Sequence, residues 1–193
     1  MGSMTDDRQL AEALRQKDEK AFSIFVTRFQ PMVARVIFKI TGDMNDTNDL
    51  TQDVFLTVWE QVEDFRGEAA LTTWVYQLAT NKALNHLKWE KRRQFFSLSY
   101  WGSDTKNTSL PKSLNDAPGR LIREDDSNAI TAALDQLPGQ QKAAFVLSKS
   151  EGLSNPEIAT ILGLSVSAVE SLNFRAKQNL TRLLKTYYQS KTT

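Results

Sequence analysis

Apolar residues recur at helical spacing over much of the chain. The first series comprises Phe22, Phe25, Val26, Phe29, Val33, Val36, Ile37 and Ile40. These positions lie three and four residues apart, as on one face of an α-helix. Pro31 stands within the series. It predicts either a second helix that begins there or a kink in one helix, because proline lacks a backbone N–H.

Two further helices are expected before residue 97. One spans residues 46 to 62, and its inner side comprises Leu50, Val54, Phe55, Val58 and Val62. Gly67 then interrupts the pattern. A longer helix follows from Leu71 to about Arg92, and its expected core residues are Trp74, Val75, Leu78 and Leu84.

Regular spacing stops at residue 97. Residues 97–128 are rich in Ser, Asn, Asp and Gly and contain Pro111 and Pro118. This composition predicts a flexible linker, with a short helix near Leu121. The chain shows neither the alternation typical of β-strands nor an internal repeat.

The second helical part begins near Ala129 and carries a helix-turn-helix pattern. Ser154 and Glu157 suit a capping box, Gly163 suits a tight turn with positive φ, and Ser165 suits the cap of the next helix. The expected inner stripe of that helix is Val169, Leu172, Ala176, Leu180 and Leu183. Such a second helix enters the DNA major groove, although hairpins with a glycine turn also occur in proteins that bind no DNA.

These elements predict an all-α fold of two small helical domains joined by a flexible linker. We expect an expression remnant at residues 1–3, before a start at Met4, and a helical bundle at residues 4–96. The linker takes residues 97–128 and the helix-turn-helix domain residues 129–193. A length of 193 residues suits two domains of this size.

The net charge of +1 hides a strong segregation of charges. Residues 42–68 contain eight acids and one base, Arg66, whereas residues 82–93 contain five bases and one acid, Glu90. A solvated helix face is the common explanation of a charge run. Segregation on this scale favours an acidic docking face for one partner and basic faces for another.

Composition also excludes several classes of protein. The chain has no cysteine and one histidine, His86, so it has no disulfide framework and no thiolate metal site. We expect no metal, no cofactor, no small-molecule substrate and no enzymatic activity. No signal peptide is visible and no apolar run approaches the length of a membrane span, so a cytoplasmic location is expected.

Residues 65–93 interleave aromatic, amide and basic side chains. Cations follow a phosphate backbone, aromatic rings stack on bases and asparagine amides read base edges, so the segment suits single-stranded DNA. The alternative is a buried amphipathic helix with a solvated basic end. Trp74 and Leu84 are core residues in either case.

Several motifs together resemble the extracytoplasmic-function (ECF) sigma factors of bacterial RNA polymerase. The matching segments are DLTQDVF at 49–55, FRGE at 65–68, TWVY at 73–76, LA at 78–79, Asn81, LDQLP at 134–138, EGLS at 151–154, EIA at 157–159 and RA at 175–176. Their order and spacing cover roughly three quarters of the chain. The resemblance identifies residues 4–96 with region 2 of that family and residues 129–193 with region 4.

The resemblance implies a protein that directs core polymerase to promoters and helps melt them. Region 2 then docks on the clamp helices of the β′ subunit through Asp49, Leu50, Gln52, Asp53 and Phe55, although Phe55 is more simply a core residue. The implied contacts to the minus-ten element are Arg66, Glu68, Ala69, Asn81, Lys82, Asn85 and Lys88. The loop at 68–71 is expected to receive a flipped base. Thr80 stands where the family often has arginine, and His86 is expected at the surface beside the DNA.

Region 4 is implied to bind the minus-thirty-five element and the flap of the β subunit. The implied DNA contacts are Ser154, Ser167, Glu170, Ser171, Phe174 and Arg175. Glu170 and Leu172 stand where lysine and arginine are common in the family. Glu170 is able to accept a hydrogen bond from a cytosine amino group, so it reads sequence on this interpretation. An anti-sigma factor is the further partner that the resemblance implies.

Two other interpretations remain at this point. A stand-alone helix-turn-helix regulator explains residues 151–180 but leaves the motifs at 49–55 and 65–81 unexplained. A helical adaptor that binds polymerase without reading promoters stays open because of the changes at Glu170 and Leu172, whereas the intact base-capture residues argue against it. Promoter melting separates the adaptor from a sigma factor.

Overall fold

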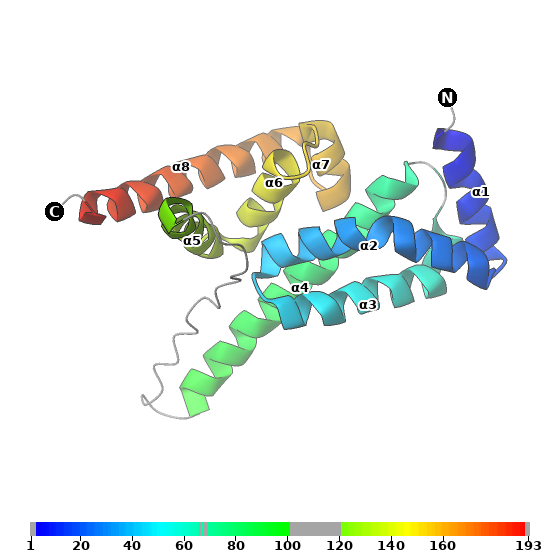
Figure 1. The fold of residues 1–193 in the computed structure, drawn as a ribbon, viewed down its shortest axis with the longest axis horizontal. Helices are drawn as coiled ribbons and strands as arrows, with labels where there is room; N and C mark the ends of the chain where they lie inside the picture. Colours follow the sequence, from blue (N-terminus) through cyan, green and yellow to red (C-terminus); the bar gives the residue numbers. More distant parts are fainter. Residues whose placement is uncertain (1–2, 66, 68, 101–120, 192–193) are drawn as a thin grey trace.

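The computed structural model describes residues 3–65, 67, 69–100 and 121–191. Its helices are α1 (Ser3–Arg15), α2 (Glu19–Thr41), α3 (Met44–Gln61), η1 (Val62–Asp64), α4 (Leu71–Tyr100), α5 (Leu121–Asp135), α6 (Gly139–Lys149), α7 (Asn155–Leu162) and α8 (Val166–Lys191). The described residues contain no β-strand, which confirms the all-α prediction. We call α1–α4 the N-terminal unit and α5–α8 the C-terminal unit (Figure 1).

The N-terminal unit is built around α2, which packs on α1, α3 and α4. Its buried residues are Ala21, Phe25, Phe29, Val33, Val36, Ile37 and Ile40. Asp18 caps the start of α2 by accepting hydrogen bonds from the N–H groups of Lys20 and Ala21. Gly42 ends it at φ +85°, a conformation that favours glycine.

Pro31 lies inside one continuous helix, so the prediction that it opens a second helix is wrong. A proline in a helix interior costs about 3 kcal/mol or more. Phe25 and Phe29 before it and Val33 and Val36 after it are buried in the same core. Their burial offsets the lost hydrogen bond, because each large apolar side chain contributes about 1.5–3 kcal/mol.

The sequence pattern did not predict α1. Leu10, Ala11 and Leu14 on this helix are buried. The Arg15 guanidinium donates a hydrogen bond to the carbonyl oxygen of Phe65, which ties α1 to the segment that precedes α4. Among residues 7–15, whose burial the structure describes, these three apolar positions form too short a pattern to detect without the partner helices.

The C-terminal unit contains the expected helix-turn-helix. Gly163 ends α7 at φ +64°, and the Ser165 hydroxyl accepts a hydrogen bond from the N–H of Ala168 at 3.2 Å. Val169, Ala176 and Leu180 are buried, and Leu172 and Leu183 are half-buried, which confirms the inner stripe of α8. A small core of Ala133, Leu137, Ala176 and Leu180 joins α5 to α8.

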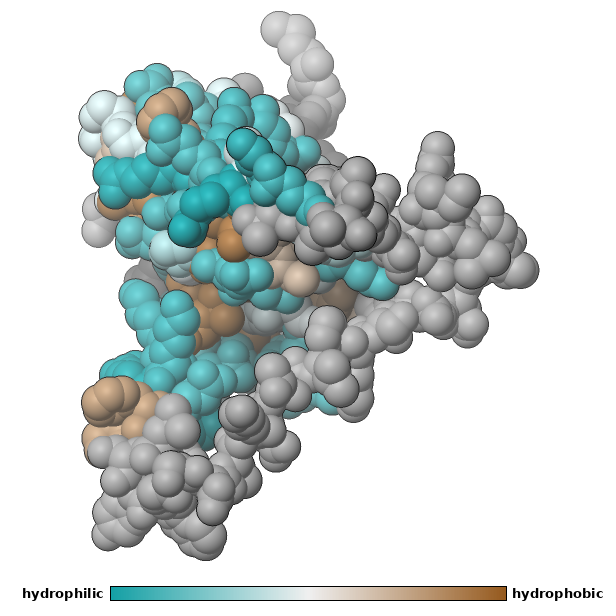
Figure 2. Space-filling view, turned by 90° about the vertical axis from the view of Figure 1, so that its left-hand side faces the viewer, coloured by the Kyte–Doolittle hydropathy of each residue, from teal (hydrophilic) through white to brown (hydrophobic). Residues whose placement is uncertain are grey.

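The two units pack directly against each other. The main core continues from α2, α3 and α4 into Ala143, Ala144, Val146 and Leu147 of α6 and into α7. Gly139 lies so close to α4 that a Cβ atom there would stand 3.3 Å from Leu84 Cδ2. Figure 2 shows a mostly hydrophilic face, with hydrophobic surface mainly in a recess between its upper and lower parts.

The helix ends at the two sides of the predicted linker differ from the predictions. α4 continues to Tyr100, past the expected end near Arg92, and α5 begins at Leu121. Of the predicted linker at 97–128, residues 101–120 lie outside the described residues. The domain boundaries therefore stay a prediction.

Within the described residues, α2 has the length and hydropathy of a membrane span, with a mean hydropathy of 1.3 over its most apolar window. The prediction that no apolar run approaches this length is therefore wrong for α2. One side of α2 is buried in the protein core, and core helices meet the same criterion.

Truncation of Phe25 tests the importance of the α2 core. Phe25 is fully buried and packs on Phe29 and Phe55, with ring centroids 4.6 and 6.0 Å away. We expect Phe25→Ala to lower the free energy of unfolding by about 3–5 kcal/mol, measured by urea denaturation followed by circular dichroism. The neighbouring Ile24 is 60% exposed, so Ile24→Ala should change it by less than about 0.5 kcal/mol. Equal losses in the two variants would contradict this core.

Candidate nucleic-acid interface

The exposed side of α3 carries the acid and amide row expected to dock on a partner. Asp49, Gln52 and Asp53 are exposed, and Leu50 is half-buried. Phe55 is 7% exposed and lies in the main core, which confirms the simpler interpretation of this residue and leaves it little surface to offer. Leu56, which the sequence reasoning missed, is 58% exposed and lies one turn from Gln52 and Asp53.

The exposed side of α4 carries amides and cations. Asn81, Asn85 and Lys88 are exposed. Lys82 is half-buried, and its Nζ lies 3.6 Å from Asp53 Oδ2 of α3. This ion pair places the acidic row of α3 and the amide row of α4 next to each other.

Thr80 faces the core. Its side chain is fully buried, and its Oγ1 has no hydrogen-bond partner in the part of the chain that the structure describes. The position at which the family often has arginine is therefore an inner position of this helix. A longer cationic side chain at position 80 would have to extend out of the core before its charge could reach DNA.

His86 is placed differently from the surface position that we predicted. Its side chain is 15% exposed, and its Nε2 lies 3.0 Å from Asp46 Oδ2 and 3.9 Å from Glu90 Oε2. These three side chains are the one described group whose ligand atoms, all within 4.8 Å of one another, could hold a metal ion. The short Asp46–His86 contact accounts for the group equally well as a histidine–carboxylate pair. The ring centroids of Trp89 and His86 lie 6.0 Å apart, and the Arg93 guanidinium carbon lies 4.7 Å from the Trp89 ring centroid.

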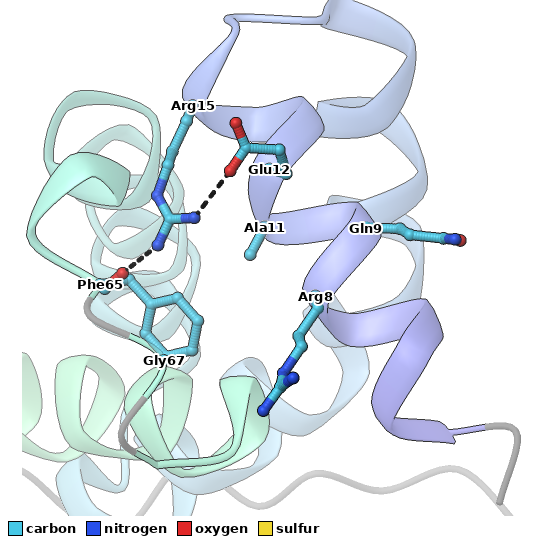
Figure 3. Close-up of a pocket in the computed structure, with 7 residues that line it drawn as sticks. All are labelled: Arg8, Gln9, Ala11, Glu12, Arg15, Phe65 and Gly67. Atoms are coloured by element: carbon cyan, nitrogen blue, oxygen red, sulfur yellow. Dashed lines mark hydrogen bonds and ion pairs between the residues drawn. The ribbon is translucent and has the colours of Figure 1, made fainter.

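The segment before α4 forms a pocket with α1 (Figure 3). The pocket has a volume of about 460 Å³ and is lined by Arg8, Gln9, Ala11, Glu12, Arg15, Phe65 and Gly67. Gly67 has φ +73°, so other side chains are strained there. Arg15 points across the pocket to Glu12 and to the Phe65 carbonyl. Arg8 lies two turns earlier on α1 and points toward the loop before α4.

Part of the predicted minus-ten set lies outside the residues that the structure describes. Arg66 and Glu68 are outside the described residues, and Ala69 is half-buried beside them. Arg8 and Arg15 belong to the helix that the sequence pattern did not reveal, so no signal in the sequence pointed to their place at the pocket.

The helix-turn-helix presents its predicted DNA-reading residues together. Ser154, Ser167, Glu170, Ser171, Phe174 and Arg175 are all exposed. They lie at the start of α7 and on the first turns of α8, and Phe174 is 61% exposed. Leu172 is half-buried, so the position where the family often has arginine turns partly inward in this chain.

The capping box at the start of α7 is present as predicted. The Glu157 carboxylate accepts hydrogen bonds from the Ser154 hydroxyl at 2.6 Å and from the Ser154 N–H at 2.8 Å. These bonds hold the pKa of Glu157 below its usual value, because they favour the charged form. The Ser154 hydroxyl donates to Glu157 and, in the capping box, accepts from the N–H of the same residue, which leaves one oxygen lone pair for an outside donor.

An ionic cluster around a buried carboxylate joins the two units, and we call Arg35, Tyr76 and Glu151 the Glu151 cluster. Arg35 of α2 binds the Glu151 carboxylate at two points, Nε to Oε1 at 2.9 Å and Nη2 to Oε2 at 2.6 Å. The Tyr76 hydroxyl of α4 donates to Glu151 Oε2 at 3.0 Å. The Glu151 side chain is 1% exposed, and Arg35 is 47% exposed.

The electrostatics of the cluster agree with this geometry. The hydrogen bonds between Arg35 and Glu151 hold the pKa of Glu151 below its usual value. They also raise the pKa of Arg35 above its usual value. Burial, followed by the hydrogen bond to Glu151, raises the pKa of Tyr76 to about 12. Sequence reasoning placed Glu151 in a motif but did not predict its partners, which are 116 and 75 residues away.

Both halves of the chain match models of one protein family. Residues 25–93 match the model of Sigma-70 region 2, and residues 127–180 match the model of Sigma-70, region 4. The RNA polymerase sigma-H factor of Pseudomonas aeruginosa is 30% identical over 187 residues, which cover 95% of this chain and 96% of that protein. The ECF RNA polymerase sigma-E factor of Haemophilus influenzae is 32% identical over 181 residues, 92% of this chain and 95% of that protein.

Two solved structures share the fold. One is the sigma factor RpoE in complex with the anti-sigma factor NepR from Bartonella quintana, with a TM-score of 0.66, 22% identity and coverage of 86% of this chain and 98% of that one. The other is CnrH in complex with the cytosolic domain of CnrY, with a TM-score of 0.64, 24% identity and coverage of 93% and 97%. At this level of identity, the likeness concerns the fold.

Replacement of Thr80 tests whether its hydroxyl is unsatisfied. We expect Thr80→Val to raise the free energy of unfolding by about 1 kcal/mol, because it removes a buried polar group without changing the side-chain shape. Thr57→Val is the control, since the Thr57 hydroxyl donates to the Asp53 carbonyl at 2.8 Å and its loss should not stabilise the protein. Urea denaturation measures both. A destabilised Thr80→Val variant would show that the hydroxyl has a partner in solution.

Proposed function

The chain belongs to the sigma-70 family as an extracytoplasmic-function sigma factor, and we propose which of its surfaces carry out each part of that role. As a sigma factor, it directs core RNA polymerase to specific promoters and acts in transcription initiation. One observation supports the assignment of surfaces most directly. The acidic row on α3 and the amide and cation row on α4 are exposed side by side, joined by the Lys82–Asp53 pair.

The row on α3 docks on the clamp helices of the β′ subunit in this proposal. Asp49, Gln52 and Asp53 present charge and hydrogen-bonding groups to a basic partner, which gives specificity and a fast encounter. Leu56 supplies an apolar contact that is already at the surface. Anchors of this kind carry much of the energy of an interface. Leu50 contributes its exposed part, whereas Phe55 supports the face from the core.

The row on α4 reads the minus-ten element as it melts. Asn81 and Asn85 are exposed one turn apart, so their amides face the same side and are able to bind base edges. Lys82 and Lys88 follow the phosphate backbone. The extruded base enters beside Ala69 and Gly67, with Arg66 and Glu68 in the same loop, and the pocket with Arg8 lies next to that loop.

The exposed turns of α7 and α8 read the minus-thirty-five element in duplex form. Arg175 and the serines Ser154, Ser167 and Ser171 supply phosphate and base contacts, and Phe174 supplies an apolar contact to a thymine methyl group. Glu170 accepts a hydrogen bond from a cytosine amino group. Glu170 therefore gives a sequence preference but provides no cation for a phosphate contact. Leu172 provides no cation for such a contact either.

Core polymerase brings the two readers to the separation of the two promoter elements. Each reader has few cations and binds weakly alone, and joint docking turns two weak contacts into one strong one. The polymerase also contributes the β flap as a contact for the C-terminal unit. The chain itself carries out no catalysis in this proposal, and it acts in the cytoplasm, where its polymerase partner lies. An anti-sigma factor remains the further partner that we propose from the family.

Substitution of the α3 row tests the docking face. We expect Asp49→Ala with Gln52→Ala to weaken binding to core RNA polymerase about tenfold or more, because the row loses a charge and an amide at the interface. Co-elution on a sizing column and a titration with labelled protein measure the change. The control is Glu60→Ala with Gln61→Ala, an acid and an amide that are exposed at the end of the same helix. An equal loss in both double variants would contradict this docking face.

Substitution of the α4 amides tests minus-ten recognition. Asn81→Ala and Asn85→Ala should each cost about 1–3 kcal/mol in open-complex formation while leaving polymerase binding unchanged, because an amide–base contact is made only with DNA. Permanganate reactivity of thymines in the promoter measures melting.

The matched control is Gln94→Ala, an exposed amide on the same helix beyond the predicted site. Full melting by the Asn81→Ala, Asn85→Ala double variant would contradict this assignment. A parent protein that binds polymerase but melts no promoter would favour the adaptor interpretation.

A further inference from the structure

The described structure packs the helix-turn-helix directly against the helix that carries the minus-ten row. α7, which immediately precedes the recognition helix α8, packs directly on α4, which carries the minus-ten row. Packed helices lie about 8–10 Å apart between their axes. The minus-ten and minus-thirty-five elements are about 25 base pairs apart, or roughly 85 Å of duplex at about 3.4 Å per base pair. The packed arrangement therefore cannot place both surfaces on both elements at once.

We propose that the Glu151 cluster holds the free protein in this closed arrangement and that core polymerase must break it to engage a promoter. The proposal rests on the function proposed for the two reading surfaces. Glu151 lies in the turn between α6 and α7, whereas Arg35 and Tyr76 lie on α2 and α4. The cluster thus connects both units at the point where the C-terminal unit meets the N-terminal one.

The burial of Glu151 makes the cluster specific for one arrangement. A carboxylate that is 1% exposed is stable only with its charge and hydrogen bonds satisfied, and the bidentate Arg35 contact and the Tyr76 hydroxyl satisfy them. Any shift of α7 along α4 leaves Glu151 buried without these partners. Complete separation of the units returns it to water. The apolar contacts of α6 and α7 hold the two units together. The cluster determines the geometry in which the units pack, and it does not prevent their complete separation.

The proposal assigns a consequence to binding as well. A protein whose competent form is only partly populated binds its partner with an affinity reduced by that fraction. Weakening the cluster should therefore tighten binding to core polymerase, although no residue of the polymerase-docking face changes. Loss of an ordinary stabilising contact would not improve an affinity.

The experiment measures the distance between the units in the full-length protein. The chain has no cysteine, so Gln30→Cys and Gln178→Cys, both exposed and one in each unit, accept spin labels without competing thiols. Pulsed electron paramagnetic resonance then gives the distance distribution in the free protein. Arg35→Gln is the test variant. Arg28→Gln is its control, because Arg28 lies two turns away on α2 and pairs with Asp7 within the N-terminal unit.

We expect one narrow distance for the parent and for Arg28→Gln, and a broad, longer distribution for Arg35→Gln. Because Arg35 is half exposed, its replacement should lower the ratio of closed to open protein by a moderate factor, roughly tenfold. Addition of Glu151→Gln to Arg35→Gln should restore part of the narrow peak, since no unpaired charge then remains buried. A broad parent distribution, or a narrow one in Arg35→Gln, would overturn the proposal.

A titration with core RNA polymerase gives the second readout. Arg35→Gln should bind several-fold more tightly than the parent, and Arg28→Gln should bind as the parent does. Unchanged or weaker binding by Arg35→Gln would overturn the inhibitory role of the closed arrangement. Failure of all variants to bind polymerase, with the narrow parent distance intact, would instead overturn the proposed function of the docking face.

Discussion

The burial of one side of α2 is the constraint on which the rest of the structure depends. α1, α3, α4 and α6 all pack on this helix, and its buried residues run over almost its whole length. The hydrophobic contribution of such a stripe is large enough to keep Pro31 within a continuous helix. Because α3 and α4 lean on the same stripe, their outer sides lie next to each other, and the acidic and amide rows form one continuous surface.

Charge has a different role in the Lys82–Asp53 pair and in the Glu151 cluster. The Lys82–Asp53 pair is open to solvent, so it contributes little to stability. The Glu151 carboxylate is buried, and a buried carboxylate strongly disfavours any packing that removes its partners. The first pair joins the exposed rows of α3 and α4, whereas the second joins the two helical units.

The family relationship and the structure support each other without being the same argument. The matched models cover both helical units, so a stand-alone helix-turn-helix regulator does not account for the chain. The structure adds that Leu172 is partly turned inward and Glu170 fully outward. In the proposed function the acid at position 170 therefore lies at the surface that contacts DNA, where it distinguishes this helix from one that relies on cations.

The sequence by itself determined the helical class, the capping box at Ser154 and Glu157, the turn at Gly163 and the inner stripes of α4 and α8. These depend on residues three or four positions apart, so local periodicity reveals them. Only the tertiary structure decided the burial of His86 and Thr80, the place of Arg8 and Arg15 at the pocket, and the meeting of Arg35 with Glu151. Such contacts join residues that are far apart in the chain, and no local pattern specifies which helix faces will meet.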